Sequence, residues 1–170
     1  MESNPSYFKG DDRPVEQVSW NDCQEFIKKV NARLSDMQFR LPTEAEWEYA
    51  CRAGTIGAYG GTGKRGEMGW YNDNSGNQTH PVGQKKPNAW GLYDMHGNLW
   101  EWCADRYGEY PSSNVIDPTG SSSESVRVLR GGCWGNPWRS CRSAFRSGNY
   151  PGLRNNRCGL RLLCSAGPRG

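Results

Sequence analysis

The sequence predicts a single domain of the α+β class, in which two N-terminal helices are followed by short strands and an unusually large amount of coil. Helical periodicity is confined to the first third of the 170-residue chain, and 22 glycines and 10 prolines mark many turns. Eight tryptophans in a chain that is 35% hydrophobic indicate a compact aromatic core. A chain of this length is long enough for one domain with a substantial core.

Two helices are predicted near the N-terminus. Ser19 can cap the first, which runs from about Trp20 to Leu34. Its apolar residues share one helical face: Cys23, Phe26, Ile27, Val30 and Leu34. Phe39–Leu41 reads as a short extended piece. Thr43 and Glu46 predict the capping box of the second helix, and Gly54 is expected to end it. Its inner stripe is Trp47, Ala50 and Cys51, and its acids either face solvent or pair with later arginines.

The middle of the chain predicts coil with few strands. Residues 55–88 show almost no periodicity apart from a possible strand at Pro81–Gly83, whereas Leu99–Trp102 alternates like a strand. Turn oxygens at Gly97 and Leu99 beside the carboxylate of Glu101 are ligands that suit calcium. The alternative is a turn held by Asn98 with a buried, salt-bridged Glu101. The sequence leaves both open, so structural calcium is the one metal expected.

The segment Val126–Leu163 differs in composition from the rest of the chain. It reads VRVLRGGCWGNPWRSCRSAFRSGNYPGLRNNRCGLRLL and holds eight arginines but no Lys, Asp or Glu. Its ends, Val126–Leu129 and Gly159–Leu163, are predicted strands, and the residues between them are typical of an irregular loop. Loops longer than about 12–15 residues in compact domains are usually functional or disordered. The aromatic residues here argue against disorder, so we expect an ordered binding loop at the surface.

Charge and hydropathy limit the classes of partner. The eight arginines resemble a phosphate-binding patch, but the rest of the chain carries 18 acidic residues against 13 basic ones (21 in total, less these eight). These acidic residues can therefore form ion pairs with the arginines within the chain, and we expect no binding of nucleic acid. No apolar run approaches the roughly 18 residues of a membrane span. The chain is expected to be a monomer.

The cysteines and histidines argue against a transition-metal centre. The cysteines number seven and include no CxxC pair, whereas zinc sites built from thiolates normally show such pairs. Cys23 and Cys51 fall on the apolar faces of the predicted helices, where a free cysteine packs as a small hydrophobic residue. Only two histidines, His80 and His96, are present, too few for a three-histidine site.

Four long motifs resemble the formylglycine-generating-enzyme, or sulfatase-modifying-factor, family. They are NPSYFKGDDRPVEQVSWNDCQEF, RLPTEAEWEYACRAG, THPVGQKKPNAWGLYDMHGNLWEWCAD and RVLRGG…RSAFRSGN…GLRL, and they cover nearly the whole chain. The resemblance implies one C-type-lectin-like domain of that family's subtype over residues 1–170. The family usually has a strand region before the first motif, which only Met1–Ser3 precede here. We therefore expect the chain to be part of a longer protein.

The resemblance raises the alternative of a formylglycine-generating-type oxidase acting on a sulfatase cysteine. Such enzymes use a cysteine pair in the loop after the RGG motif. Asn136 stands at the place of the first cysteine, and only Cys141 remains of the pair. Related iron-dependent sulfoxide synthases need three histidines, which the chain lacks. We therefore expect no catalytic activity and no catalytic residues.

The same segment also resembles the variable region of proteins diversified by retroelements, in which template adenines are randomised during copying. Nine residues stand where that pattern has Asn: Gly135, Ser140, Phe145, Ser147, Gly148, Tyr150, Leu153, Arg157 and Cys158. An AAC codon changed at its adenines can encode every one of them but cannot encode Trp138. We call these nine, together with Asn136 and Trp138, the variable positions, and they are the predicted ligand-binding residues.

The resemblance implies a non-enzymatic display protein with a hypervariable loop at about residues 126–163. The retained arginines are expected to fix the loop, while Phe145 and Tyr150 are expected to be exposed and Trp134 to pack in the core. The partner is expected to be a protein or another macromolecule. The resemblance also implies a cell-surface location, through a lipid anchor upstream of this chain.

Overall fold

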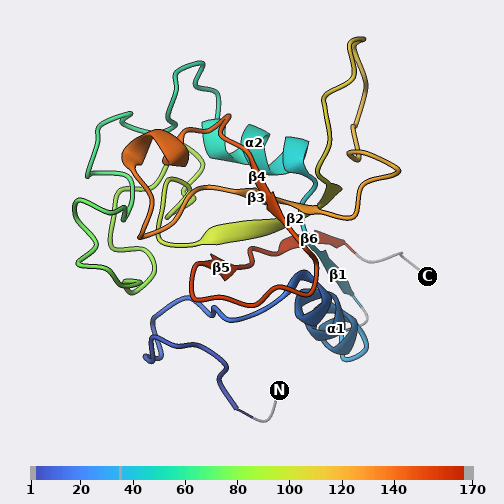
Figure 1. The fold of residues 1–170 in the computed structure, drawn as a ribbon, viewed down its shortest axis with the longest axis horizontal. Coiled ribbons are helices and arrows are strands. Elements are labelled where there is room, and N and C mark those ends of the chain that lie inside the picture. The colour runs from blue at the N-terminus through green and yellow to red at the C-terminus, as the bar shows by residue number, and fades with distance from the viewer. Residues whose placement is uncertain (1–2, 35, 167–170) are drawn as a thin grey trace.

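The computed structural model describes residues 3–34 and 36–166. Two helices, α1 (Trp20–Asn31) and α2 (Glu44–Arg52), flank strand β1 (Met37–Arg40). The later elements are β2 (Trp100–Arg106), β3 (Arg127–Arg130), the 3-10 helix η1 (Trp138–Cys141), β4 (Ser147–Asn149), β5 (Cys158–Gly159) and β6 (Leu163–Ala166). The fold is thus the predicted α+β arrangement, with a long irregular region between α2 and β2 (Figure 1).

Four strands form the central sheet in the order β4-β3-β2-β5, and β1 pairs with β6 in a separate two-stranded sheet. β2 runs antiparallel to β3 and parallel to β5. Figure 1 shows α2 on one side of the central sheet and α1 on the other. The segment from β3 to β5 therefore begins and ends beside β2, which fixes both ends of the predicted binding loop.

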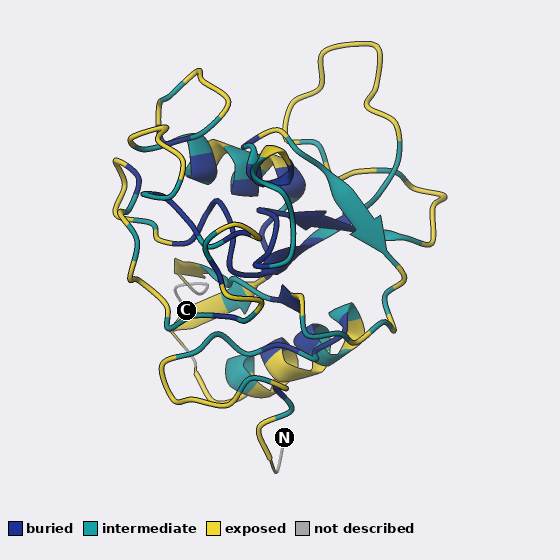
Figure 2. Ribbon diagram, turned by 60° about the vertical axis from the view of Figure 1, so that its left-hand side comes forward, coloured by how far each residue is buried: buried dark blue, intermediate teal, exposed yellow. Residues whose placement is uncertain are grey.

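The core lies on both faces of the central sheet (Figure 2). Trp102 of β2 and Leu129 of β3 pack on the side of α1, whereas their neighbours Cys103 and Val128 pack toward Trp47 of α2. This alternation follows from the opposite directions of successive side chains in a strand. Trp102 and Trp47 are fully buried, and truncation of either to Ala should cost about 3–5 kcal/mol.

Both predicted helix caps are confirmed. Ser19 accepts a hydrogen bond from the backbone N–H of Asp22, whose side chain accepts one in return, and Thr43 and Glu46 form the same reciprocal pair. These bonds satisfy N–H groups that the first turn of a helix leaves free.

Several predicted details are wrong. α1 ends at Asn31, and its predicted core residues Phe26 and Leu34 are exposed. The left-handed residue that ends α2 is Ala53 (φ 44°), one position before Gly54. Pro81–Gly83 is a turn and not a strand. The predicted strand Gly159–Leu163 is divided between β5 and β6, because β5 pairs with β2 while β6 pairs with β1.

Candidate functional site

The binding loop is anchored by Arg130, the last residue of β3. Its side chain is fully buried. The guanidinium donates to the carbonyl oxygen of Phe145 at 2.6 Å and to the carboxylate of Glu48, and it lies 3.5 Å from the Glu44 carboxylate. Since Glu44 and Glu48 belong to α2, this arginine joins the loop, the sheet and the helix. A buried charge needs such partners, because burial without them costs several kcal/mol (~3–5).

Three further arginines of the segment bind carboxylates of distant elements through two nitrogens each. Arg146 binds Glu44 at 2.6 and 2.7 Å. Arg154 binds Asp22 at 2.6 Å through both nitrogens, and Arg161 binds Glu101 at 2.9 and 2.8 Å. Two parallel bonds fix direction as well as distance. We call Arg130, Arg146, Arg154 and Arg161 the arginine framework.

The framework explains how a segment with little regular structure keeps one conformation. Its arginines reach acids in α1, α2 and β2, so the loop is tied to three elements that precede it. Glu44 and Glu48 pair with later arginines, as one of the two alternatives predicted, and Glu46 pairs with Arg40 at the surface. Arg40 lowers the pKa of the Glu46 carboxyl to about 2.

Nine of the eleven variable positions are exposed or partly exposed. Tyr150 is 65% exposed, and Arg157 also faces solvent. Seven are half-buried: Gly135, Asn136, Trp138, Phe145, Ser147, Gly148 and Leu153. The Arg157 guanidinium lies 5.1 Å from the centre of the Trp134 ring, which itself is buried as predicted. These nine are the accessible variable positions.

Ser140 and Cys158 were predicted to face a ligand, and this is wrong. Ser140 in η1 is 8% exposed, and Cys158 in β5 is 2% exposed. Cys158 belongs to the core cluster with Cys133 and Trp134, because β5 lies directly beside the core strand β2. Side chains buried in this way cannot contact a partner without unfolding of the loop.

Phe145 and Gly148 also differ from the prediction. Phe145 was expected to be exposed but is half-buried, because it packs partly against the core with its ring centre 6.0 Å from that of Trp100. Gly148 is half-buried, but a Cβ atom there would lie 2.7 Å from Cγ1 of Val126 and 3.0 Å from the Tyr107 ring. A larger residue at this position would therefore require the Val126 side chain or the Tyr107 ring to shift.

Trp138 rests on residues that the sequence did not single out. Its ring stacks on Tyr59 at a centroid distance of 4.3 Å and lies 5.0 Å from Tyr71, and the Tyr59 hydroxyl donates to its carbonyl oxygen at 3.2 Å. Both tyrosines come from the irregular region after α2, where the sequence shows no periodicity that would predict this contact. The stack holds Trp138 as a rigid aromatic group at the edge of the surface.

The two places of a catalytic cysteine pair hold Asn136 and a buried Cys141. The thiol of Cys133 donates to Oδ1 of Asn136 at 2.9 Å. Cys141 is fully buried, and burial raises the pKa of its thiol to about 12. A thiol with such a pKa supplies almost no thiolate at neutral pH, although the thiolate is the reactive and metal-binding form.

The carboxylate of Glu101 is occupied by protein donors. Arg161 binds both of its oxygens, and Nε1 of Trp47 donates to Oε2 at 2.6 Å. The structure thus matches the alternative in which Glu101 is a buried, salt-bridged residue beside the turn at Gly97 and Leu99. Asp94 is one residue that the sequence analysis missed here: it is 7% exposed, and its Oδ1 atom has no hydrogen-bond partner. An orphaned buried carboxylate oxygen fits a cation, so calcium binding at this turn stays a prediction.

Within residues 3–34 and 36–166, no cluster of three or more His, Cys, Asp and Glu side chains is placed to hold a metal ion. No helix in these ranges is long and apolar enough to cross a bilayer. Any calcium site at the turn would therefore need backbone oxygens in addition to carboxylates.

Comparison with known proteins assigns the chain to a family. Residues 1–166 match the sulfatase-modifying factor enzyme 1-like domain. The chain belongs to this family. The formylglycine-generating enzyme of Streptomyces coelicolor is 35% identical over 90% of this chain and 53% of its own length. The chain thus spans about half the length of that relative.

Solved structures of the family give the same fold. Treponema denticola variable protein 1 is 33% identical, with a TM-score of 0.89 over 96% of this chain and 78% of the other. PvdO from Pseudomonas aeruginosa is 31% identical, with a TM-score of 0.79 over 93% and 64%. The C-type-lectin-like fold of this family is therefore confirmed. The relatives include proteins named as formylglycine-generating enzymes, and a similar solved structure is named as a variable protein, so membership of the family alone does not decide the activity.

Proposed function

We propose that this domain is a non-enzymatic binding module that presents the accessible variable positions to a macromolecular partner, most simply a protein. The single observation that carries the proposal is the arginine framework beneath the loop. Its bonds are to acids and carbonyls of the same chain, so they hold the backbone without help from the variable side chains. Replacement of an exposed side chain then changes what the surface binds and leaves the fold intact.

The chemistry of the accessible positions suits a protein partner. Tyr150 and Trp138 offer large rigid rings that lose little conformational entropy on binding, and Arg157 adds an exposed cation. Residues of these three types are enriched at the energetic centres of protein interfaces. The likeness to Treponema denticola variable protein 1 supports the same role.

Diversification by a retroelement is part of the proposal and rests on the codon pattern of the nine replaced asparagines. The burial of individual residues divides these nine positions into exposed and buried ones. Tyr150, Leu153 and Arg157 are the positions best placed to vary freely, whereas Ser140 and Cys158 are held in the core. Display at a cell surface through an upstream lipid anchor rests on the resemblance of the segment to such variable regions.

The second candidate is a formylglycine-generating oxidase, which the relatives named as such enzymes favour. It requires a reactive cysteine pair. Asn136 supplies no thiol, and the raised pKa of Cys141 opposes the chemistry of the remaining one. We therefore place binding ahead of catalysis.

Two assays test the choice. In the first, a library randomised at Tyr150, Leu153 and Arg157 is displayed and selected against a panel of purified proteins. We expect specific binders to emerge, and a library randomised at Ser140, Phe145 and Cys158, which lie in or against the core, should yield almost none. In the second, the chain is incubated with a Cys-x-Pro-x-Arg peptide and copper. Turnover of the peptide would contradict the proposal.

A further inference from the structure

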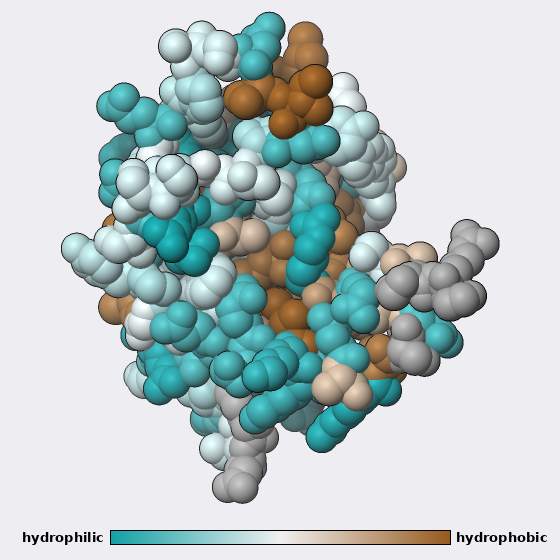
Figure 3. All heavy atoms as spheres, turned by 90° about the vertical axis from the view of Figure 1, so that its right-hand side faces the viewer, coloured by the Kyte–Doolittle hydropathy of each residue, from teal (hydrophilic) through white to brown (hydrophobic). Residues whose placement is uncertain are grey.

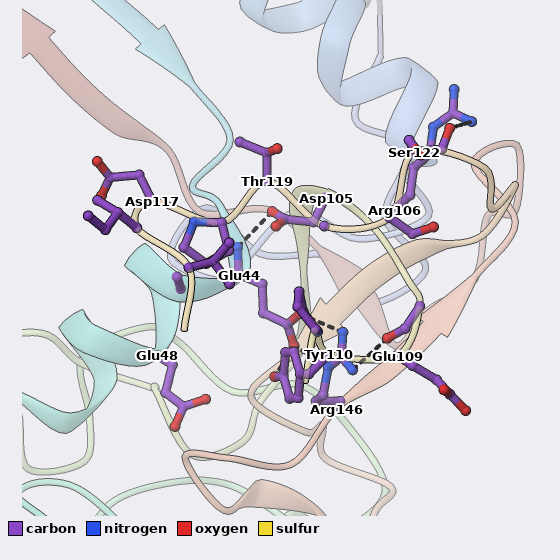
Figure 4. A pocket seen from close by; sticks show the side chains of 18 of the residues that line it. Glu44, Glu48, Asp105, Arg106, Glu109, Tyr110, Asp117, Thr119, Ser122 and Arg146 are labelled. Carbon is purple, nitrogen blue, oxygen red and sulfur yellow. Dashed lines mark hydrogen bonds and ion pairs between the residues drawn. The ribbon is translucent and has the colours of Figure 1, made fainter. Parts of the chain in front are cut away.

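A cavity of about 770 Å³ lies between α2 and the loop of residues 107–125, and none of the variable positions lines it. Figure 1 shows this loop on the opposite side of the molecule from η1. The floor of the cavity is formed by side chains of α2 and β2, with Arg146 of the framework at one end (Figure 4). Volumes of about 300–1,000 Å³ are typical of sites for small organic ligands.

Two of the three arginines that line the cavity, Arg146 and Arg52, have all their guanidinium nitrogens engaged within the chain. Arg146 binds Glu44 through two nitrogens and donates a third bond to the carbonyl oxygen of Gly108 at 2.9 Å. Arg52 binds Glu48 and donates to the carbonyl oxygen of Gly57 at 2.9 Å. Arg106 donates to the carbonyl oxygen of Glu124 at 3.1 Å. A bound anion would have to displace these bonds.

Acidic groups of the cavity remain available. Among the described residues, Glu109 and Asp117 take part in none of the ion pairs, and Figure 4 shows them at opposite sides of the cavity. Asp105 in the floor is 3% exposed and accepts a bond from the backbone N–H of Glu44 at 2.7 Å. The free charge of the cavity is therefore negative, in a chain whose net charge is +3.

The walls of the cavity are apolar and unusually exposed. Tyr49 is 69% exposed, Tyr110 61%, Val115 53% and Ile116 91%. Figure 3 shows hydrophobic atoms gathered at the top of this face, over the 107–125 loop. Exposed apolar side chains that surround a cavity with unpaired carboxylates form a site for a ligand that has both an apolar part and a positive charge.

We propose that this cavity binds an organic cation with an apolar body, such as an aromatic amine or the arginine side chain of a short peptide. The apolar body would lie against Tyr110 and Ile116, and the ammonium or guanidinium group would face the nearer of the two unpaired carboxylates, that of Glu109 or that of Asp117. The site is separate from the variable positions, so its ligand does not change when the exposed variable side chains do. The inference does not depend on the proposed partner of the variable surface.

Calorimetric titration tests the site with three probes. Phenethylamine is the free organic cation, N-acetyl-Phe-Arg-amide presents the cation on a peptide, and 2-phenylethanol is the neutral analogue of the first. We expect saturable binding of at least one cationic probe and none of the alcohol at the same concentrations. Binding of both cations indicates a free amine as a sufficient ligand, whereas binding of the peptide alone assigns a peptide segment.

Variants locate the site. Glu109→Gln with Asp117→Asn should weaken binding of the cation about tenfold, as expected for the loss of two partly exposed charge contacts. The matched control is Asp12→Asn with Glu25→Gln, which removes the same charge from exposed positions elsewhere and should leave affinity unchanged. The proposal would be overturned if neither cation bound saturably. It would also be overturned if the alcohol bound as tightly as the cations, or if both double variants weakened binding of the cation equally.

Discussion

Arg146 binds Glu44 through two hydrogen bonds of 2.6 and 2.7 Å, although the two residues are 102 positions apart in the sequence. The guanidinium also lies 3.9 Å from the centre of the Tyr110 ring. This pair ties β4 and its neighbouring loop to the first turn of α2. Its counterparts at Arg130, Arg154 and Arg161 repeat the arrangement, so an irregular segment is held by side chains instead of a long strand ladder.

The buried arginine of the framework should be the most sensitive. Arg130→Ala removes the partner of Glu48 and leaves unpaired charge in the interior, so we expect a loss of about 3–5 kcal/mol in the free energy of unfolding. Urea denaturation followed by tryptophan fluorescence measures it. Arg139→Ala is the control from the same segment, because Arg139 is exposed, and it should change stability by less than about 0.5 kcal/mol. Similar losses in the two variants would contradict the role given to the framework.

The Arg154–Asp22 pair predicts a dependence on pH. Its hydrogen bonds hold the pKa of the Asp22 carboxyl well below its usual range. A lowered carboxyl pKa contributes stability above the unfolded value of about 4, and the contribution is lost as the pH falls through the folded value. Arg154→Gln should therefore lower Tm at neutral pH and have a diminishing effect toward about pH 2. A difference in Tm that stays constant over this range would argue against the ion pair.

Thiol reactivity tests the arrangement of the cysteines. Cys164 is exposed, whereas the other six are buried, and burial raises the pKa of Cys51 and Cys141 to about 12. We expect one thiol per native chain to react rapidly with Ellman's reagent and Cys164→Ser to abolish this fast phase. A fast phase that persists in this variant and disappears in Cys141→Ser would instead favour a reactive, enzyme-like cysteine.

The parts of the fold that depend on local chemistry were predictable from the sequence. Ser19 and Thr43 cap their helices through residues three positions away, so both starts could be read directly. The last two strands could not be predicted, because the division of Gly159–Leu163 depends on which strands lie beside it. In the candidate site, too, tertiary contacts could not be predicted from the local sequence.

Within the site, the composition of the loop revealed the arginine framework but not the burial of individual positions. Ser140 and Cys158 have the same codon signature as Tyr150, yet tertiary packing places them in the interior. The support of Trp138 by Tyr59 and Tyr71 joins regions about 70–80 residues apart, and no periodicity signals such a contact.

We propose that calcium binds at the turn beside Asp94, whose Oδ1 atom lacks a hydrogen-bond partner and whose pKa is raised chiefly by burial. Added calcium should then raise Tm, because a ligand that binds only the folded state stabilises it. Asp94→Asn should abolish the increase, and the exposed control Asp12→Asn should not. An unchanged Tm of the wild-type chain in calcium and in chelator would leave Glu101 as a purely structural ion pair with Arg161.

The central claim is that exposed variable side chains can be replaced while the arginine framework keeps the fold. Thermal denaturation of two triple variants tests it most directly. Tyr150, Leu153 and Arg157 changed together to Asn should lower Tm by only a few degrees, because these side chains are exposed or half-buried. Ser140, Phe145 and Cys158 changed together to Lys should prevent cooperative folding, since they place unpaired charges in or against the core. Collapse of the first variant, or survival of the second with an unchanged Tm, would contradict the account.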